Sequence, residues 1–302
     1  MKKINIADQI ENLKKIKNFF TSTQRRMILL LCLLTVIAAG IIVYDIRLSN
    51  NYLSFRDTKI YVGSSFPGKD TSDSASIFSY QTGKVRISVH EYDEYPSHFF
   101  VADVWVKDTD CFRCAFSNNE YDTNDQTALE IARNSDALIA VNSDFNWGLV
   151  IRNGELFSTD AWDTPMLVMY INGRMEINYD QYYTDPDKLL RSGVMNTWTF
   201  GPVLVDDGSN VCPEEDESYD PRTALGYYCP GHYCFVVVDG RQRGYSSGIY
   251  LSDLADLMVS LGCRIAYNFD GGASSQMVAE GKYINHPSQE RLQRNMIVIT
   301  DR

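Results

Sequence analysis

An uninterrupted apolar run at residues 27–44 constrains this chain more than any other feature of its sequence. The run is 18 residues long, contains no charged residue, and is flanked by Arg25–Arg26 and Asp45. As a helix it would be about 27 Å long, close to the thickness of a bilayer's hydrocarbon core. The polar lead before it is long for a cleaved signal peptide, and the run has no polar face for a core helix. We therefore predict a transmembrane helix at 27–46.

The charges on the two sides of this run differ in sign. Residues 1–44 hold seven of the 28 basic residues but only two of the 39 acidic residues, so the remaining 258 residues have a net charge of −16. The positive-inside rule then predicts a cytoplasmic segment at 1–26 and an extracytoplasmic remainder. The polar stretch at 47–83 reads as a linker, and 84–302 as the folded domain. A pI near 4.8 argues against a nucleic-acid partner.

Six of the seven cysteines lie in the predicted extracytoplasmic part. This even number in an oxidising compartment favours disulfides, although many pairings are open. Two local pairings are the simplest: Cys229 with Cys234 across a hairpin, and Cys111 with Cys114 in a tight loop. A zinc site at Cys111 and Cys114 is less favoured, because no second Cys-x-x-Cys follows and the histidines lack ligand spacing.

The folded domain is predicted to be rich in strands. Residues 85–90 and 99–107 alternate apolar and polar side chains, and Asn153–Gly154 suits a hairpin turn. Helical spacing is confined to short segments, chiefly 127–134 and 251–261. We therefore expect the α/β or α+β class, as a single mixed-sheet domain with few helices, preceded by the membrane helix.

Polar residues and glycines follow or precede apolar strands at four places. These are 142–145, 220–223, 239–241 and 268–275. Strand ends are where a sheet presents functional groups, and the two glycines after Asp270 would let the backbone approach a ligand closely. Each place also has an ordinary interpretation: a turn at 239–241, a surface ion pair, or a loop cap. Together they combine an arginine, acids and a glycine–serine loop, the set that a phosphate ester would need.

At these positions the sequence resembles the phosphodiester glycosidase family. The resemblance covers residues 99–302 and implies hydrolysis between an anomeric carbon and a phosphate oxygen, giving free sugar and a phosphomonoester. Ser143 and Ala273 replace glycines that are common in the family, which bears on substrate shape. Eight motifs carry the resemblance in order: AVNSDF (140–145), VIRNGELF (150–157), FGPVLVDDG (200–208), DPRTALGY (220–227), VVVDGR (236–241), SGIYLSDLADLMVSLGC (247–263), AYNFDGGASSQM (266–277) and INHPSQER (284–291).

A phosphate monoester is a better leaving group than an alkoxide, so arginine and backbone N–H groups can replace much of a general acid's role. The resemblance therefore implies Asp270 as the carboxylate that acts at the anomeric carbon, directly or through water. Asp239 and Asp144 are the other candidate catalytic acids, Asp144 being also a candidate for orienting sugar hydroxyls. The predicted substrate-binding residues are Arg222, Asn142, Asn268, Gly271, Gly272, Ser274, Ser275, Arg241 and Arg291.

The expected substrate is a phosphate-linked glycan of the cell envelope or an exopolysaccharide, met by an enzyme tethered to the cell membrane. No cofactor or metal is expected, although clustered aspartates with a hard cation remain an alternative. Two other functions stay open at this point. One is a metal-dependent phosphodiesterase that cleaves the P–O bond, and the other is a non-catalytic glycan-binding module of the cell wall.

Overall fold

The computed structural model describes residues 76–94, 96–213 and 218–301, together with scattered helical positions between 27 and 40. The chain divides into two units, Met1–Ser54 and Phe55–Arg302, and the fold described below is that of the second. In the described part of the chain, no helix combines the length and apolar character that a membrane crossing requires. The predicted segment 1–26 lies outside the described residues, as do most of the predicted membrane helix at 27–46 and most of the linker at 47–83.

The largest element is an eight-stranded sheet in which every neighbouring pair is antiparallel. Its first strand, β1 (Phe78–Gln81), lies within the segment 47–83 that the sequence assigns to a linker. In spatial order the strands are β1 (Phe78–Gln81), β2 (Val85–Glu94), β3 (Ser97–Val106), β14 (His232–Asp239), β13 (Arg222–Cys229), β15 (Ile265–Phe269), β11 (Val203–Asp206) and β12 (Ser209–Asn210).

A five-stranded sheet packs against one face of the large sheet. Its order is β17 (Lys282–Tyr283), β16 (Met277–Ala279), β5 (Ile139–Asn142), β18 (Asn295–Ile299) and β4 (Phe112–Phe116). Successive residues of a strand point to opposite faces of its sheet. In β3, Phe100 and Ala102 accordingly join the core between the two sheets, whereas Phe99 and Val101 face the other side.

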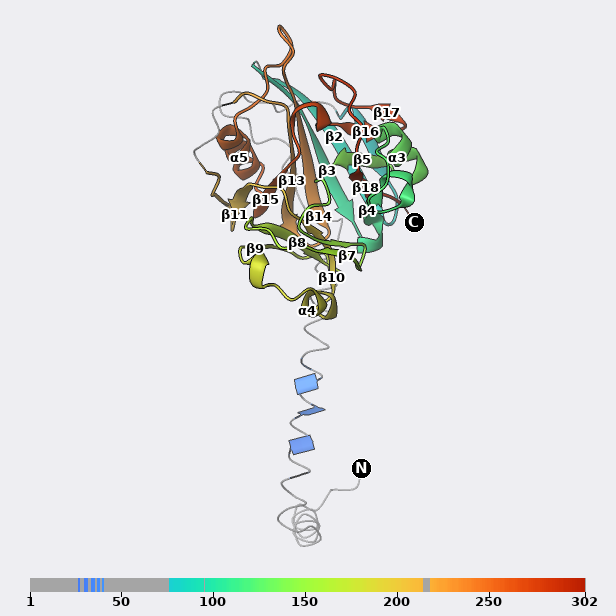
Figure 1. Ribbon diagram of the computed structural model, residues 1–302, viewed down its shortest axis with the longest axis vertical. Coiled ribbons are helices and arrows are strands. Elements are labelled where there is room, and N and C mark those ends of the chain that lie inside the picture. Colours follow the sequence, from blue (N-terminus) through green and yellow to red (C-terminus); the bar gives the residue numbers. More distant parts are fainter. Residues whose placement is uncertain are drawn as a thin grey trace, which may run out of the picture. The chain divides into compact units, whose positions relative to one another are not determined.

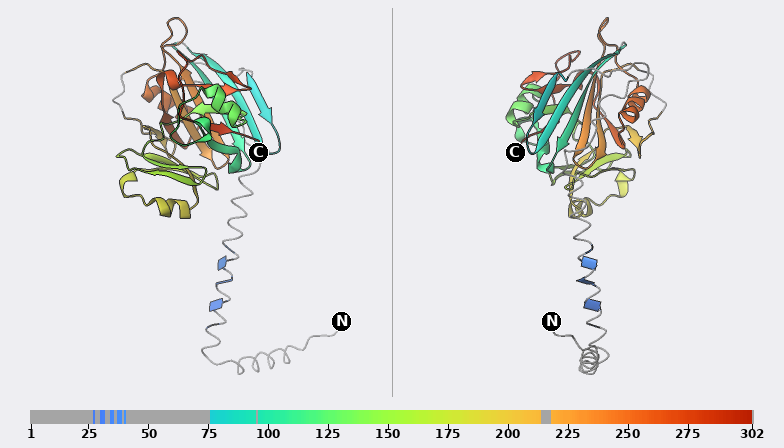
Figure 2. Two further views of the ribbon diagram at one scale, coloured as in Figure 1. Left: turned by 45° about the vertical axis from the view of Figure 1, so that its right-hand side comes forward. Right: turned by 180° about the vertical axis from the view of Figure 1, so that it is seen from behind.

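Helices cover the outer faces of this two-sheet core (Figures 1 and 2). Helix α5 (Leu251–Ser260) packs its buried leucines on the large sheet, and Tyr250 begins it without a side-chain cap. Helix α3 (Ala128–Asn134) packs on the five-stranded sheet and begins with a capping box between Thr127 and Glu130. The layers therefore run helix, sheet, sheet, helix.

Two small sheets complete the domain. One has the order β10 (Val194–Trp198), β8 (Met166–Tyr170) and β9 (Met175–Asn178), and the other pairs β6 (Leu149–Arg152) with β7 (Glu155–Thr159). Helix α4 (Pro186–Arg191) packs beside them. The 3₁₀ helices are η1 (Thr109–Cys111), η2 (Ser117–Asn119), η3 (Gln181–Tyr183) and η4 (Gly272–Ser274).

The prediction of a strand-rich domain with few helices is confirmed, with one correction. Within the described residues, all neighbouring strands are antiparallel, so no sheet there combines parallel and antiparallel strands. These strands also form four sheets, where the sequence predicts a single one. Half of the neighbouring pairs are hairpins, such as β1–β2 and β13–β14, which produce antiparallel neighbours, and the pairs between strands distant in the chain, such as β3–β14 and β5–β18, are antiparallel as well.

The predicted pairings of Cys229 with Cys234 and of Cys111 with Cys114 are not seen among the described residues. In the β13–β14 hairpin Cys229 pairs with His232, while Cys234 pairs with Gly226, so the hairpin register separates the two cysteines. The Cys234 sulfur instead lies 3.6 Å from the sulfur of Cys263, which is two residues before β15. This distance is well beyond the length of a covalent S–S bond.

Candidate active site

The four predicted site segments meet at one edge of the structure. In the antiparallel large sheet, Arg222 at the start of β13 pairs with Val238 near the end of β14. Thr223 pairs with Phe269 at the end of β15, immediately before Asp270. These three strands therefore present their polar ends together, and β5 of the other sheet reaches the same place through Asn142.

Asn142 joins the two sheets at this point. Its fully buried amide donates from Nδ2 to the Asp270 carbonyl oxygen (2.7 Å). Its Oδ1 accepts from the Thr223 hydroxyl (2.7 Å) and from the Gln276 N–H (3.1 Å). Asn142 therefore fixes the backbone at Asp270, and both of its amide atoms are engaged within the domain.

The segment after Asp270 requires both of its glycines. A Cβ on Gly271 would stand 2.7 Å from the Pro221 carbonyl oxygen, and one on Gly272 would stand 2.9 Å from Nη1 of Arg241. Gly272 also has a φ of +62°, in the left-handed region. The N–H groups of Gly272, Ser274 and Ser275 already donate within the domain, to the carbonyl oxygens of Pro221, Gly271 and Gly272 respectively. The glycines thus bring the chain close to Arg241, and these N–H groups hold the turn.

Two predicted arginines converge on Asp220. Nε of Arg241 donates to Oδ1 of Asp220 (2.8 Å), and Nη2 of Arg222 lies 4.0 Å from Oδ2. Burial raises the pKa of Asp220, but hydrogen bonds from Ser218 and Arg241 and the two arginine charges outweigh it and hold that pKa below its ordinary value. Two guanidinium groups around one carboxylate leave a local excess of positive charge beside the glycine segment.

Asp270 is partly buried, and burial raises its pKa above the ordinary value for a carboxyl group. The Ser274 hydroxyl, the positive charge of Arg291 and the Gly271 N–H oppose this rise. The hydroxyl lies beside the carboxyl without a hydrogen bond of regular geometry. The guanidinium of Arg291, itself exposed, also lies 5.7 Å from the centre of the Phe145 ring. Asp270 therefore combines a raised proton affinity with a nearby cation.

The segment around Asp270 concentrates buried polar atoms that have no hydrogen-bond partner among the described residues. Buried polar atoms are normally paired, so such a concentration calls for an explanation. Asn268 still donates from Nδ2 to the Gly201 carbonyl oxygen (2.7 Å), so this residue is held in place while its other amide atom is unpaired. The five buried side-chain atoms of this segment that have no hydrogen-bond partner in the described part of the chain are Asn268 Oδ1, Asp270 Oδ2, Ser274 Oγ, Ser275 Oγ and Gln276 Oε1.

Asp144 is engaged in a buried ion pair. Its Oδ1 accepts from Nη2 of Arg152 (2.6 Å), and both side chains are fully buried. The Thr199 N–H donates to Oδ2 (3.2 Å), and the Arg152 guanidinium also donates to the Thr197 carbonyl oxygen. Asp144 therefore anchors the loop that follows β5, and its carboxylate is occupied by the ion pair with Arg152.

Asp239 at the end of β14 is also buried and satisfied. Its carboxylate accepts from the Tyr245 hydroxyl (2.9 Å), from Nδ2 of Asn285 (2.7 Å) and from the His286 N–H (2.9 Å). Burial raises its pKa, and these three hydrogen bonds oppose the rise. Asn285 also donates to the Ser275 carbonyl oxygen (2.9 Å), so Asp239 supports the site segment from behind.

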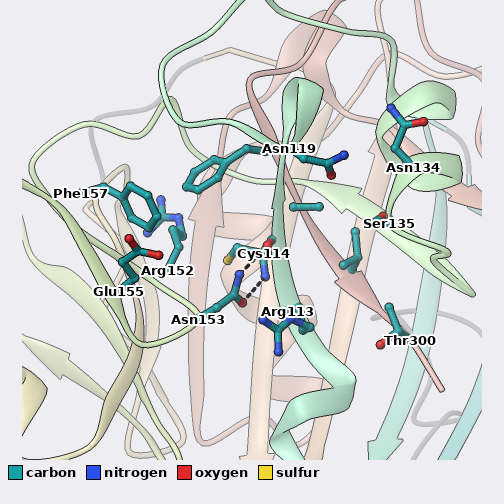
Figure 3. A pocket seen from close by; sticks show the side chains of 13 residues that line it. Arg113, Cys114, Asn119, Asn134, Ser135, Arg152, Asn153, Glu155, Phe157 and Thr300 are labelled. Carbon is teal, nitrogen blue, oxygen red and sulfur yellow. Dashed lines mark hydrogen bonds between the residues drawn. The ribbon is translucent and has the colours of Figure 1, made fainter. Parts of the chain in front are cut away.

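A separate cavity of about 390 Å³ lies on the side of Arg152 that faces β4 and β7 (Figure 3). In the close-up, Arg152 lies between Phe157 and Cys114, and Asn153 is hydrogen-bonded to the Cys114 backbone. None of the predicted site residues lines this cavity. Within residues 76–94, 96–213 and 218–301, no group of three or more histidine, cysteine or acidic side chains is arranged to hold a metal ion.

Several contributors to the site were not anticipated from the sequence. Arg152, Gln276 and Asn285 lie in three of the family motifs, but the sequence alone predicts no role for any of them. One signal for Arg152 was available: it is a lone charge at the end of the apolar stretch Leu-Val-Ile-Arg. A charge in such a stretch, when buried, requires a partner.

Comparison with known proteins identifies a family. Residues 120–300 match the profile of a family described as phosphodiester glycosidase. A protein of Bacillus subtilis (strain 168), the SPbeta prophage-derived uncharacterized protein YomE, is 34% identical over an alignment of 182 residues that covers 55% of this chain and 28% of that protein. The chain thus spans less than a third of that relative's length.

Two solved structures share the fold. The catalytic domain of zebrafish N-acetylglucosamine-1-phosphodiester alpha-N-acetylglucosaminidase, auto-inhibited by its pro-peptide, has a TM-score of 0.57 and 18% identity, covering 76% of this chain and 87% of that domain. A hypothetical protein from Synechocystis has a TM-score of 0.58 and 14% identity, covering 76% of this chain and 64% of that one. At these identities the likeness concerns the fold.

Proposed function

Since the chain belongs to the phosphodiester glycosidase family, we propose that it hydrolyses a sugar-1-phosphodiester between the anomeric carbon and the phosphate oxygen. Water supplies the hydroxyl group that ends on the sugar carbon, and its proton balances the phosphomonoester that leaves. The products are a free reducing sugar and a phosphate monoester. No metal takes part in the steps assigned below.

Asp270 is the carboxylate that acts at the anomeric carbon, either by direct attack or by deprotonating water. Both roles require the ionised form, and the raised pKa gives the carboxylate a higher basicity than an exposed aspartate has. The positive charge of Arg291 keeps the ionised form accessible. Asp270 therefore combines a raised basicity with a neighbouring cation that favours its ionised form.

The phosphate group is held by Arg222 and Arg241 beside the glycine segment. Their shared carboxylate, Asp220, has a lowered pKa and stays ionised, which fixes the two guanidinium groups while leaving net positive charge. Arginine binds phosphate oxygens through charge-assisted hydrogen bonds and stabilises the charge that develops on the leaving oxygen. This arrangement supplies the leaving-group stabilisation that a general acid would otherwise provide.

One observation carries the proposal. Five buried polar side-chain atoms without partners lie within nine residues, 268–276, around a carboxyl of raised pKa. A folded domain ordinarily pairs such atoms. A site that must bind a polyhydroxylated, charged substrate has a reason to leave them available.

The substrate would be a phosphate-linked glycan of the envelope or an exopolysaccharide. This part of the proposal rests on the apolar run at 27–44 and the basic residues before it, which favour a membrane-anchored chain with the enzyme domain outside. The acidic surface means that attraction for the phosphate is local to the arginines.

Hydrolysis in ¹⁸O-labelled water tests the reaction. Cleavage of the C1–O bond places the label on the sugar, whereas cleavage of either P–O bond places it on phosphate. The full chain is incubated with methyl N-acetylglucosamine-1-phosphate, with and without a chelator. We expect labelled free sugar and no effect of the chelator; labelled phosphate would overturn the proposal in favour of a phosphodiesterase.

Asp270→Asn tests the residue assignment. Loss of a general base or nucleophile should lower kcat by at least about 10²–10⁴-fold. The matched control is Asp207→Asn, because Asp207 is an exposed aspartate that pairs loosely with Arg264 at 3.4 Å. Parental activity in Asp270→Asn would remove Asp270 from the mechanism. A parent that binds the ester without turnover would instead indicate a glycan-binding module.

A further inference from the structure

Four aromatic side chains form a continuous surface beside the site. The Phe145 ring lies 4.7 Å from that of Trp147 and 5.9 Å from that of Phe200, and Trp147 stacks on Trp162 at 5.2 Å with 21° between the planes. Trp147 and Trp162 are 43% and 41% exposed. We call these two residues the tryptophan platform. Large exposed aromatic surfaces of this kind usually mark a binding surface.

The tryptophan platform is continuous with the candidate active site. Phe145 directly follows Asp144 and contacts both Trp147 and Arg291. The charge of Arg291 in turn acts on the Asp270 carboxyl. A ligand lying on the two tryptophans would therefore extend toward the proposed reaction centre.

Buried polar contacts hold the platform in place. The Gln181 side chain is 2% exposed, and its Oε1 accepts from the N–H groups of Trp162 (3.0 Å) and Leu149 (3.3 Å), tying the two tryptophan loops together. Gly148 packs so closely that a Cβ there would lie 2.8 Å from the same Oε1. A surface fixed by such contacts before binding loses little freedom when a ligand arrives.

The charges around the platform select its ligand. Trp162 lies between two exposed acids, Asp160 and Asp163. These carboxylates repel nucleic acids and anionic membranes, but they accept hydrogen bonds from hydroxyl groups. The C–H face of a pyranose ring is apolar and can lie on an aromatic ring while its hydroxyls reach the acids. A neutral sugar ring satisfies both features.

We infer that the tryptophan platform binds a sugar ring of the glycan to which the scissile phosphodiester is attached, as an additional subsite. This inference rests on the proposed function for the position of the ring relative to the phosphate. It makes the enzyme selective for an ester within a glycan over an ester of a small alcohol.

The test compares two substrates in the parent and in Trp147→Ala and Trp162→Ala. One substrate is methyl N-acetylglucosamine-1-phosphate, and the other carries an N-acetylglucosamine tetramer in place of the methyl group. Each variant should raise KM for the tetramer ester at least about tenfold relative to KM for the methyl ester, equivalent to about 1.4 kcal/mol. The control is Tyr183→Ala, since Tyr183 is 85% exposed and lies outside the platform; it should leave the ratio unchanged.

A binding experiment separates this inference from the proposed function. The free N-acetylglucosamine tetramer is titrated against the full chain, with intrinsic tryptophan fluorescence as the readout. Suppose that neither ester is hydrolysed, but the tetramer quenches the tryptophan fluorescence of the parent and not that of the variants. The proposed hydrolysis is then refuted and the subsite stands. If the KM ratio is unchanged and the tetramer does not bind, the subsite is refuted while hydrolysis stands. Binding of a nucleic acid or of anionic lipid vesicles in its place would also overturn it.

Discussion

The Asp144–Arg152 ion pair is expected to be the polar contact on which the site's stability depends most. Arg152→Met removes the cation and leaves Asp144 in a fully buried position without its 2.6 Å partner. It also removes the guanidinium donor from the Thr197 carbonyl oxygen. Breaking a buried pair by removing one partner costs about 3–5 kcal/mol, because an uncompensated charge remains.

For a domain of this size, about 1 kcal/mol corresponds to about 2–4 °C in Tm, so Arg152→Met should lower Tm by about 6–20 °C. Differential scanning calorimetry measures the change. The double variant Asp144→Asn with Arg152→Met removes the stranded charge and should recover part of the loss, which a double-mutant cycle quantifies.

The control is an exposed pair of the same residue types. Arg264 and Asp207 lie 3.4 Å apart, with side chains 65% and 90% exposed, so Arg264→Met should change stability by less than about 1 kcal/mol. The reasoning fails if Arg152→Met melts within a degree or so of the parent, or if the double variant is no more stable than the single one.

Three further predictions concern protonation, thiols and a glycine. Because burial raises the pKa of Asp270, the folded domain binds this proton more tightly than the unfolded chain, and stability is lost as pH rises through the folded pKa. Asp270→Asn should therefore raise Tm near neutral pH and raise it by less below about pH 4 in scanning fluorimetry; an equal shift at both pH values would contradict this. Burial raises the pKa of Cys114 to about 12, so iodoacetamide near pH 8 should label Cys114 only after unfolding in urea, as followed by mass spectrometry. Gly148 has a φ of +73° and Gly154 one of +85°, but only Gly148 lacks room for a Cβ. Gly148→Ala should thus cost about 1–3 kcal/mol more than Gly154→Ala in urea unfolding, and equal costs would refute the steric argument.

Local patterns in the sequence predicted much of the strand content. The turn at Asn153–Gly154 is confirmed, and both residues have positive φ. Strands β4 and β10 were not anticipated, because β4 is short and lies between 3₁₀ turns, and β10 contains the buried polar residues Asn196 and Thr197. A core strand that contains buried polar residues lacks the apolar pattern of a strand. The hydropathy pattern also does not show which partner forms hydrogen bonds with those residues.

The sequence predicted many residues of the candidate site, but not the role of each of them. The strand-end rule located Asn142, Asp239 and Asp270 together, and the structure does bring these segments to one edge. The sequence could not reveal that Asp239 and Asp144 are saturated with hydrogen bonds while one Asp270 oxygen is not. That distinction depends on partners such as Asn285 and Arg152, which come from distant segments.

Asn142 belongs to one sheet, and the loop that it fixes belongs to the other. The reactive geometry therefore exists only while the two layers are in register. A slip of either layer by a fraction of an ångström at this seam would misplace Asp270 although both sheets kept their own hydrogen bonds. Heat or denaturant should accordingly abolish turnover before circular dichroism reports any loss of strand. The difference between the midpoints of these two transitions would measure how strongly the two sheets are held together.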